Sequence, residues 1–267
     1  MSKLGLIAGN GVFPLYVARA ARRDGLEVIA VAHQGETDPA LAELAESITW
    51  IKVGELQRMV EVFKSAGVTT AAMAGGIARA SLPAAFAPDT RALAMLQRIG
   101  RFSDDAVLRG VAGELEADGI AIIDPVPMLD DVIARPGAAS GPEPSASQLS
   151  DLALAFTVAR AVGHFDIGQA VAVRDGVVAA VEAVEGTDAA LRRAAKLWGP
   201  GLVVAKAAKP GQDLRFDRPA IGPATIELLA EIGAAMIGVE AGTAMLLERE
   251  LVLERAQALG VTIYGYG

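Results

Sequence analysis

The first 74 residues alternate between short apolar runs and segments of helical periodicity, and this alternation restricts the fold more than any other feature of the sequence. Strands are expected at 3–8, 28–32, 48–53 and 69–74, and the intervening segments include helices at 39–46 and 56–66. Parallel strands need such long crossover connections, whereas antiparallel strands can be joined by tight turns. Apolar strands alternating with helices are typical of a parallel sheet covered on both faces. The sequence therefore predicts an N-terminal Rossmann-like α/β domain.

A stretch rich in Pro, Gly, Ser and Ala interrupts this pattern between Arg135 and Ser147. Such a composition is typical of a linker, so we expect a first domain at 1–134, a linker at 135–147 and a second domain at 148–267. In the second domain, Arg174-Asp175-Gly176 between two apolar runs indicates a β-hairpin. Further strand and helix patterns follow, so the second domain should be α/β with a mixed sheet.

The composition excludes several classes of function. The 267 residues contain no cysteine, which excludes disulfides, thiolate nucleophiles and cysteine-ligated metal sites. The net charge of −8, without a basic stripe, argues against nucleic acid as a partner. No signal-peptide pattern opens the chain, and no apolar run reaches the roughly 20 residues that span a bilayer. We expect a cytoplasmic protein, with any membrane contact peripheral.

Two glycine turns follow expected strands of the first domain. Gly9-Asn10-Gly11 follows the first strand and Gly75-Gly76 follows the fourth, so both should lie at the carboxyl edge of the sheet, where ligands bind. Their backbone N–H groups suit a phosphate or a polar headgroup. The first turn departs from the dinucleotide fingerprint, because Pro14 replaces the third glycine and no acid follows the second strand at 32–34. A plain tight turn is the alternative.

Charged residues concentrate in one loop of the second domain, between an expected strand at 201–205 and a helix beginning near Pro223. The loop carries Lys206, Lys209, Gln212, Asp213, Arg215, Asp217 and Arg218. Cations and carboxylates beside a helix N-terminus are suited to bind a phosphate and a divalent metal. A solvated surface loop is the alternative.

This inventory favours hydrolysis of a phosphoric anhydride. His33 and His164 belong to no nucleophile or metal motif, so both are left out of the mechanism. Anhydride hydrolysis needs negative charge neutralised and a water placed in line, and Mg²⁺ prefers oxygen ligands. The candidate metal or water ligands are Asp217, Asp213, Asp188 and Glu185, and the candidate phosphate ligands are Lys206, Lys209 and Arg215.

Several segments resemble the LpxI-type UDP-2,3-diacylglucosamine pyrophosphatase family. They are DIGQAVAV (166–173), AVEAVEGTDAALRR (180–193), VAKAAKPGQDLRFDRPAIGPATI (204–226) and GVEAG (238–242), together with the opening LGLIAGNGVFP (4–14) and the AGGIAR turn (74–79). The likeness spans nearly the whole chain. It departs in the Ala/Pro-rich linker and at Gly75-Gly76, where many members have Gly-Asn, which puts a polar contact near Gly76 in doubt.

The resemblance implies hydrolysis of UDP-2,3-diacylglucosamine to UMP and 2,3-diacylglucosamine 1-phosphate (lipid X) in lipid A biosynthesis. It implies Mg²⁺ (or Mn²⁺), attack of water on the β-phosphorus, and Asp217 as the key acid. With the residues above, the expected catalytic residues are Asp217, Asp213, Lys206 and Lys209, and the expected metal ligands are Asp217, Asp188 and Glu185. The expected substrate-binding residues are Gly9, Asn10, Gly11, Gly75, Gly76, Gln169, Gly186, Thr187, Gln212 and Arg215.

The lipid nature of substrate and product implies peripheral association with the cytoplasmic face of the inner membrane, for which Arg19, Arg22 and Arg23 are candidates. A homodimer is compatible with so apolar a chain. Two other functions stay open at this point. One is a nucleotide-binding or NAD-linked enzyme, and the other is a non-catalytic sensor of a phosphorylated ligand.

Overall fold

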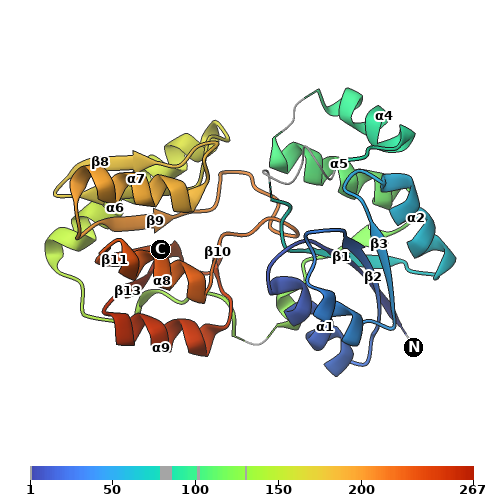
Figure 1. Ribbon diagram of the computed structural model, residues 1–267, viewed down its shortest axis with the longest axis horizontal. Coiled ribbons are helices and arrows are strands. Elements are labelled where there is room, and N and C mark those ends of the chain that lie inside the picture. Colours follow the sequence, from blue (N-terminus) through green and yellow to red (C-terminus); the bar gives the residue numbers. More distant parts are fainter. Residues whose placement is uncertain (1, 79–85, 101–102, 130) are drawn as a thin grey trace. The chain divides into compact units, whose positions relative to one another are not determined.

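The computed structural model describes residues 2–78, 86–100, 103–129 and 131–267 (Figure 1). The chain divides into two compact units. Unit 1 comprises Met1–Asp130 and Asp213–Asp217, and unit 2 comprises Asp131–Gln212 and Arg218–Gly267. The chain therefore passes from unit 2 into unit 1 and back within the charged loop.

Unit 1 is built on a five-stranded sheet in the order β3-β2-β1-β4-β5. All neighbouring strands run parallel, which confirms the predicted Rossmann-like sheet. The strands are β1 (Lys3–Ala8), β2 (Glu27–His33), β3 (Ser47–Ile51), β4 (Thr70–Ala74) and β5 (Ala121–Ile122). The strand order reverses at β1, because β2 lies on one side of it and β4 on the other. This is the position at which open α/β sheets bind ligands.

Alternate residues of these strands feed two separate cores. Leu4 and Leu6 pack with α1 (Phe13–Arg23) on one face, and Ile7 packs on the other face with α2, α4 and α5. Those helices are α2 (Leu56–Ser65), α4 (Thr90–Ile99) and α5 (Asp104–Ala117). The described part of the unit also contains the 3₁₀ helices η1 (Pro39–Glu43) and η2 (Val126–Met128). Strands buried on both faces explain the continuous apolar runs in the sequence.

Unit 2 contains a six-stranded sheet in the order β6-β13-β11-β9-β7-β8. The strands are β6 (Gly137–Ser140), β7 (Ala170–Arg174), β8 (Val177–Val181), β9 (Val203–Lys206), β11 (Met236–Glu240) and β13 (Thr262–Tyr266). Strands β9, β11 and β13 run parallel, whereas β6, β7 and β8 pair antiparallel to their neighbours, so the predicted mixed sheet and hairpin are confirmed. A small parallel pair joins β10 (Ala220–Ile221) to β12 (Met245–Leu246).

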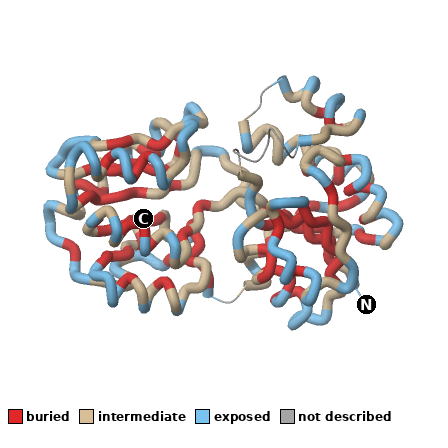
Figure 2. The backbone as a smooth tube through the Cα atoms, viewed as in Figure 1, coloured by how far each residue is buried: buried red, intermediate tan, exposed pale blue. Residues whose placement is uncertain are grey.

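Helices cover both faces of this sheet, and the strands are buried between them (Figure 2). Helix α6 (Ala146–His164) covers one face, while α7 (Thr187–Trp198), α8 (Pro223–Glu231) and α9 (Arg249–Leu259) cover the other. Helix α6 approaches the sheet closely over Gly238, where a Cβ atom would lie 3.0 Å from the Phe156 ring. Within the described ranges, no helix combines the length and the apolar character needed to cross a bilayer.

The expected linker at 135–147 is wrong for its central part, because residues 137–140 form strand β6 at the edge of the unit 2 sheet. The small residues in and around this segment are explained by close packing. A side chain on Gly265 of β13 would overlap the Arg135 carbonyl, and one on Gly141 would lie 2.8 Å from Thr262 Cα. Ser140 Oγ also donates a hydrogen bond to Leu253 O at 2.7 Å. The composition that suggested flexibility therefore reflects a close approach of two backbones.

Candidate functional site

The two glycine turns of unit 1 lie against each other at the carboxyl ends of β1 and β4. Gly9 N donates to Ala74 O at 2.8 Å, and Asn10 N donates to Gly76 O at 2.7 Å. A Cβ atom on Gly9 would lie 2.8 Å from the carbonyl carbon of Gly75, so the turns meet backbone to backbone. The predicted proximity of the two turns is confirmed, and their ligand role stays a prediction.

Glu36, which was not among the expected site residues, joins these turns. Asn10 Nδ2 donates to Glu36 Oε2 at 2.8 Å, and Ala78 N donates to the same oxygen at 3.0 Å. In the sequence, Glu36 stands three positions after His33, the last residue of β2. It lies just beyond residues 32–34, where the dinucleotide fingerprint would place an acid. The Asn10 side chain is therefore engaged in shaping the turn. Arg79, the last residue of the AGGIAR motif, lies outside the described residues.

His33 lies buried beneath the first glycine turn. Its Nδ1 donates to Ala8 O at 2.9 Å, and Thr37 Oγ1 donates to the same carbonyl at 2.6 Å. Burial lowers the pKa of His33, while the hydrogen bond to Ala8 and the charge of Glu36 act in the opposite direction. These contacts give the imidazole a structural role under the end of β1.

In unit 2, the expected polar residues gather at one edge of the six-stranded sheet. Lys206 ends β9 and pairs in register with Ala170, so Gln169, just before β7, lies at the same edge. Glu240 ends β11, the next parallel strand. Lys206 Nζ donates to Ala220 O at 2.8 Å, which ties the end of β9 to β10.

Glu182 organises the part of this edge around Gln169 and Thr187, and it too was not among the expected site residues. Gln169 N and Ala170 N donate to Glu182 Oε2 at 3.0 and 2.9 Å, and Thr187 Oγ1 donates to Oε1 at 2.7 Å. Gly186 is the N-cap residue of α7. The buried carboxylate thus brings Gln169, Gly186 and Thr187 together. In the sequence, Glu182 is recognisable as an acid between the apolar run of β8 and the start of α7.

The beginning of the charged loop folds onto the same edge. Ala208 N donates to Glu240 Oε2 at 2.9 Å, and Lys209 N donates to Gln212 Oε1 at 2.8 Å. Gln212 Nε2 and Gln169 Oε1 are buried and find no hydrogen-bond partner within the described ranges. Buried polar atoms normally have partners, so these two amides are suited to contact a ligand or ordered water.

The next part of the loop, Asp213–Asp217, belongs to unit 1 instead. Arg215 Nη2 donates to Asp213 Oδ2 at 2.8 Å, and Arg215 Nη1 donates to Glu116 Oε1 at 2.8 Å. The hydrogen bond from Arg215 lowers the pKa of Asp213, and its two carboxylate partners raise the pKa of Arg215. The expected residues Asp213 and Arg215 are thus paired with each other, and Asp217 N donates to Asp213 O at 3.1 Å.

The three expected metal ligands come from both units. Asp217 belongs to unit 1, whereas Glu185 and Asp188 are exposed residues of unit 2. Glu185 Oε1 accepts a hydrogen bond from Arg193 Nη2 at 2.7 Å, which lowers the pKa of Glu185. In the part of the chain that the structure describes, no three acidic or histidine side chains gather as a metal ion requires. The metal-binding role of Asp217, Asp188 and Glu185 therefore stays a prediction.

The fold and these contacts define a class of α/β protein. A parallel sheet carries paired glycine turns at its switch point, and a mixed sheet carries lysines and buried amides at a strand edge. Comparison with known proteins makes the class specific. Residues 3–132 match the LpxI N-terminal domain, and residues 135–264 match the LpxI C-terminal domain. The chain therefore belongs to the LpxI family.

A characterised relative matches over the full length. The UDP-2,3-diacylglucosamine pyrophosphatase LpxI of Caulobacter vibrioides is 35% identical over 278 aligned residues, covering 99% of this chain and 98% of that protein. Solved structures match only weakly. The biotin carboxylase subunit of pyruvate carboxylase gives 15% identity and a TM-score of 0.28, covering 74% of this chain and 43% of that one. The biotin carboxylase domain of Hydrogenobacter thermophilus 2-oxoglutarate carboxylase gives 16% identity and a TM-score of 0.26, covering 66% of this chain and 36% of that one.

Proposed function

We propose that the protein hydrolyses the pyrophosphate bond of UDP-2,3-diacylglucosamine and releases UMP and lipid X, a step of lipid A biosynthesis. The observation that carries this proposal is the 35% identity to the Caulobacter enzyme over 99% of this chain. The protein is then a UDP-2,3-diacylglucosamine diphosphatase, a phosphoric anhydride hydrolase. The matches of both halves to LpxI domains favour this activity over an NAD-linked enzyme or a phospho-ligand sensor.

The residues of the charged loop, together with Gln169, support specific roles. Water attacks the β-phosphorus, the bond to the bridging oxygen breaks, and UMP leaves with that oxygen. Lys206 and Lys209 neutralise phosphate charge, which is the largest need of such a reaction. The free amide atoms of Gln169 and Gln212 hydrogen-bond the ligand. Asp217 orients the attacking water and accepts its proton.

The glycine turns of unit 1 support a binding role of their own. Gly11 is exposed and has a positive φ of 79°, so the turn presents its backbone without a side chain. Backbone N–H groups at the end of β1, just before α1, are suited to an anionic group. We assign Gly9, Asn10, Gly11, Gly75 and Gly76 to contacts with a phosphate or a polar headgroup.

We also propose that the reaction requires Mg²⁺ (or Mn²⁺). Mg²⁺ is usually bound through one or two carboxylates plus substrate phosphates, so Asp217 is the carboxylate that we favour for it. Because the described residues hold no preformed cluster, we assign no step to the ion. Treatment with EDTA should stop hydrolysis, and either Mg²⁺ or Mn²⁺ should restore it. Undiminished turnover in EDTA would refute this requirement.

The central experiment is an assay of the purified protein with UDP-2,3-diacylglucosamine in detergent micelles prepared in ¹⁸O-labelled water. UMP and lipid X should form, and the label should enter lipid X because water attacks the β-phosphorus. Label in UMP would show attack on the α-phosphorus instead. Absence of hydrolysis would refute the proposed activity. Ligand binding without turnover would then support the sensor, and a thermal shift with NAD would support the NAD-linked enzyme.

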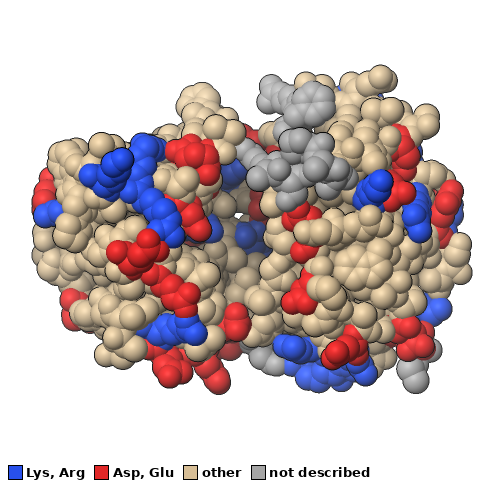
Figure 3. Space-filling model, viewed as in Figure 1, with Lys and Arg blue, Asp and Glu red and all other residues tan. Residues whose placement is uncertain are grey.

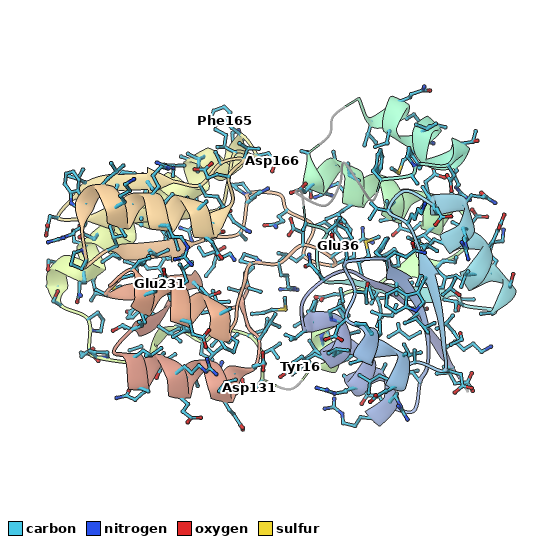
Figure 4. The ribbon with its side chains drawn as sticks, in the orientation of Figure 1. Tyr16, Glu36, Asp131, Phe165, Asp166 and Glu231 are labelled. Carbon is cyan, nitrogen blue, oxygen red and sulfur yellow. The ribbon has the colours of Figure 1, made fainter. Side chains whose placement is uncertain are left out.

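Peripheral association with the cytoplasmic face of the inner membrane follows from the acyl chains of the proposed substrate. Basic side chains gather over α1, where Arg19, Arg22 and Arg23 are exposed (Figure 3). In unit 2, the apolar Phe165 is 75% exposed and Val184 is 81% exposed. The Phe165 ring points away from the ribbon beside Asp166 (Figure 4). The arginines of α1 are suited to bind anionic lipid headgroups, and the exposed apolar side chains of unit 2 are suited to contact acyl chains.

A homodimer remains a further proposal. Strand β8 is an edge strand whose one strand neighbour is β7, and it exposes Val177 and Val178. Such an edge can pair with a second copy. Sedimentation equilibrium of the purified protein would decide between monomer and dimer.

A further inference from the structure

The segment Asp213–Asp217 is fastened to unit 1 through the guanidinium of Arg215. Arg215 Nε donates to Asp213 Oδ1 at 3.0 Å, and Nη2 donates to Asp213 Oδ2 at 2.8 Å, so the pair is bidentate. Arg215 Nη1 donates to Glu116 Oε1 at 2.8 Å and to Ile122 O at 3.2 Å. Planar bidentate contacts of this kind fix geometry as well as charge. One side chain of the loop thus contacts α5 and β5.

Asp213 gives the segment its shape. Its Oδ1 accepts a hydrogen bond from Arg215 N at 3.1 Å, and its carbonyl oxygen accepts from Phe216 N at 3.3 Å and Asp217 N at 3.1 Å. An aspartate that caps its own turn in this way is a common turn-former. The turn begins at Asp213 and ends at Asp217, so the position of Asp217 depends directly on how Asp213 is held.

A second arginine supports the carboxylate of Asp213 from α5. Arg109 Nη1 lies 3.7 Å from Asp213 Oδ2, and Arg109 Nε donates to Asp105 Oδ2 at 2.7 Å. Asp213 therefore lies between two guanidinium groups. Its side chain is only 13% exposed, so the pairing is partly shielded from water.

Apolar packing holds Phe216, the residue that follows Arg215. Phe216 packs against the unit 1 core that contains Leu115 and Ile122. The Arg215 guanidinium carbon lies 5.6 Å from the centre of the Phe216 ring, which is within cation–π range. Ionic and apolar contacts thus hold adjacent residues of a segment whose flanking residues, Gln212 and Arg218, belong to unit 2.

From these contacts we propose that Glu116 and Arg109, together with Asp213 and Arg215, are positioning residues that hold Asp217 for hydrolysis. This inference rests on the proposed function of Asp217. It reassigns Asp213 and Arg215, whose charged groups are already paired with each other, from catalysis and substrate binding to an anchor. Glu116 and Arg109 lie in the first half of the chain, outside every motif of the charged loop.

Glu116→Gln tests the anchor while leaving the shape of the side chain unchanged. We expect kcat to fall about 10- to 100-fold, because a small misplacement of a reacting group is costly, while KM stays within about twofold of wild type. Trypsin should also cleave after Arg215 faster in the variant, since the segment is released. Glu231→Gln is the matched control, because it breaks the exposed Arg192–Glu231 ion pair in unit 2. Glu231→Gln should change neither kcat nor the rate of trypsin cleavage after Arg215.

A double variant shows whether Glu116 acts through Asp217. Glu116→Gln should slow an Asp217→Asn enzyme by less than about twofold, because the group being positioned is already disabled. Full additivity of the two losses would overturn the inference, as would wild-type kcat in Glu116→Gln or a lower kcat without faster cleavage. If the wild-type protein does not hydrolyse the lipid, the proposed function fails. The trypsin rates would then still show whether Glu116 holds the segment.

Discussion

Lys209 Nζ donates a hydrogen bond of 2.5 Å to Asp166 Oδ1. The pair joins the loop after β9 to the turn after α6. Asp166 lies in that turn beside Phe165 (Figure 4). Its φ of 57° is left-handed. Asp tolerates that conformation better than most residues. The lysine side chain is only 14% exposed, so its ammonium is held in one place. In the proposed site, a bound phosphate would share the ammonium with Asp166.

Lys209→Ala should therefore lower kcat/KM about 100-fold or more, because a fixed cation next to the transferred phosphate is lost. Asp166→Asn should give a smaller loss, since the cation remains but is less well held. The control is Lys196→Ala, which removes an exposed lysine from the last turn of α7. Steady-state kinetics with UDP-2,3-diacylglucosamine measure all three. Lys209→Ala with unchanged kcat/KM would remove the lysine from the site.

Asp217→Asn should lower the rate of UMP release by about 100- to 10,000-fold, because the amide cannot accept a proton from water. Binding of lipid X, followed by calorimetry, should be retained, since the acid serves the water rather than the lipid. Asp175→Asn is the control, because Asp175 is an exposed residue of the β7–β8 turn whose left-handed φ of 53° suits asparagine equally well. Turnover close to wild type in Asp217→Asn would refute its assignment.

The parts of the fold that the sequence predicted are those encoded by neighbouring residues. Strands β1, β2 and β4 were evident because both faces of each are buried, which leaves nearly uninterrupted apolar runs. The β7–β8 hairpin was evident from Asp175-Gly176, and the buried Asp151 supports it by accepting hydrogen bonds from both backbone nitrogens at 2.8 Å. The proximity of the two glycine turns followed from the common direction of β1 and β4.

The parts that the sequence did not predict depend on distant partners. Arg215 contacts Glu116 and Ile122, which lie 99 and 93 positions away, and no local pattern reports such a contact. Glu36 and Glu182 were overlooked because a single acid near a strand end has no periodicity. The composition of 135–147 predicts a linker where the structure has the edge strand β6, because close backbone packing and flexibility select the same small residues.

Gly9→Ala should lower the free energy of unfolding by about 1–3 kcal/mol, because the added methyl group would overlap the backbone of the second glycine turn. The backbone of Gly9 has an ordinary negative φ, so the cost arises from space alone. Gly113→Ala is the matched control in α5, where a Cβ atom meets nothing within 4 Å. It should stabilise the protein by about 0.5–1 kcal/mol. Urea unfolding measures both, and an equally stable Gly9→Ala would contradict the close contact.

His33 should make stability depend on pH below neutrality. Burial places its folded-state pKa below the ordinary value of 6.5, so the unfolded chain binds a proton more readily. Stability is therefore fully present above about pH 6.5 and falls as the pH decreases, by at most about 1.4 kcal/mol per pH unit. Urea unfolding between about pH 7 and pH 5 should show a shallower decline for His33→Gln than for wild type. The same substitution at the exposed His164 is the control, and equal slopes in His33→Gln and wild type would refute the role of burial.

Phe165 should contribute to membrane binding, because it lies next to Asp166, the partner of Lys209, and exposes most of its ring. The nearby apolar side chains of Ile167 and Val184 are 48% and 81% exposed. Burial of a phenylalanine ring in lipid contributes about 1.5–3 kcal/mol, so Phe165→Ser should weaken binding to vesicles of anionic phospholipid about 10- to 100-fold. Leu259→Ser is the control, because it removes a half-exposed apolar side chain from the end of α9. Vesicle flotation distinguishes the two, and equal binding of both variants would show that the Phe165 surface does not enter the membrane.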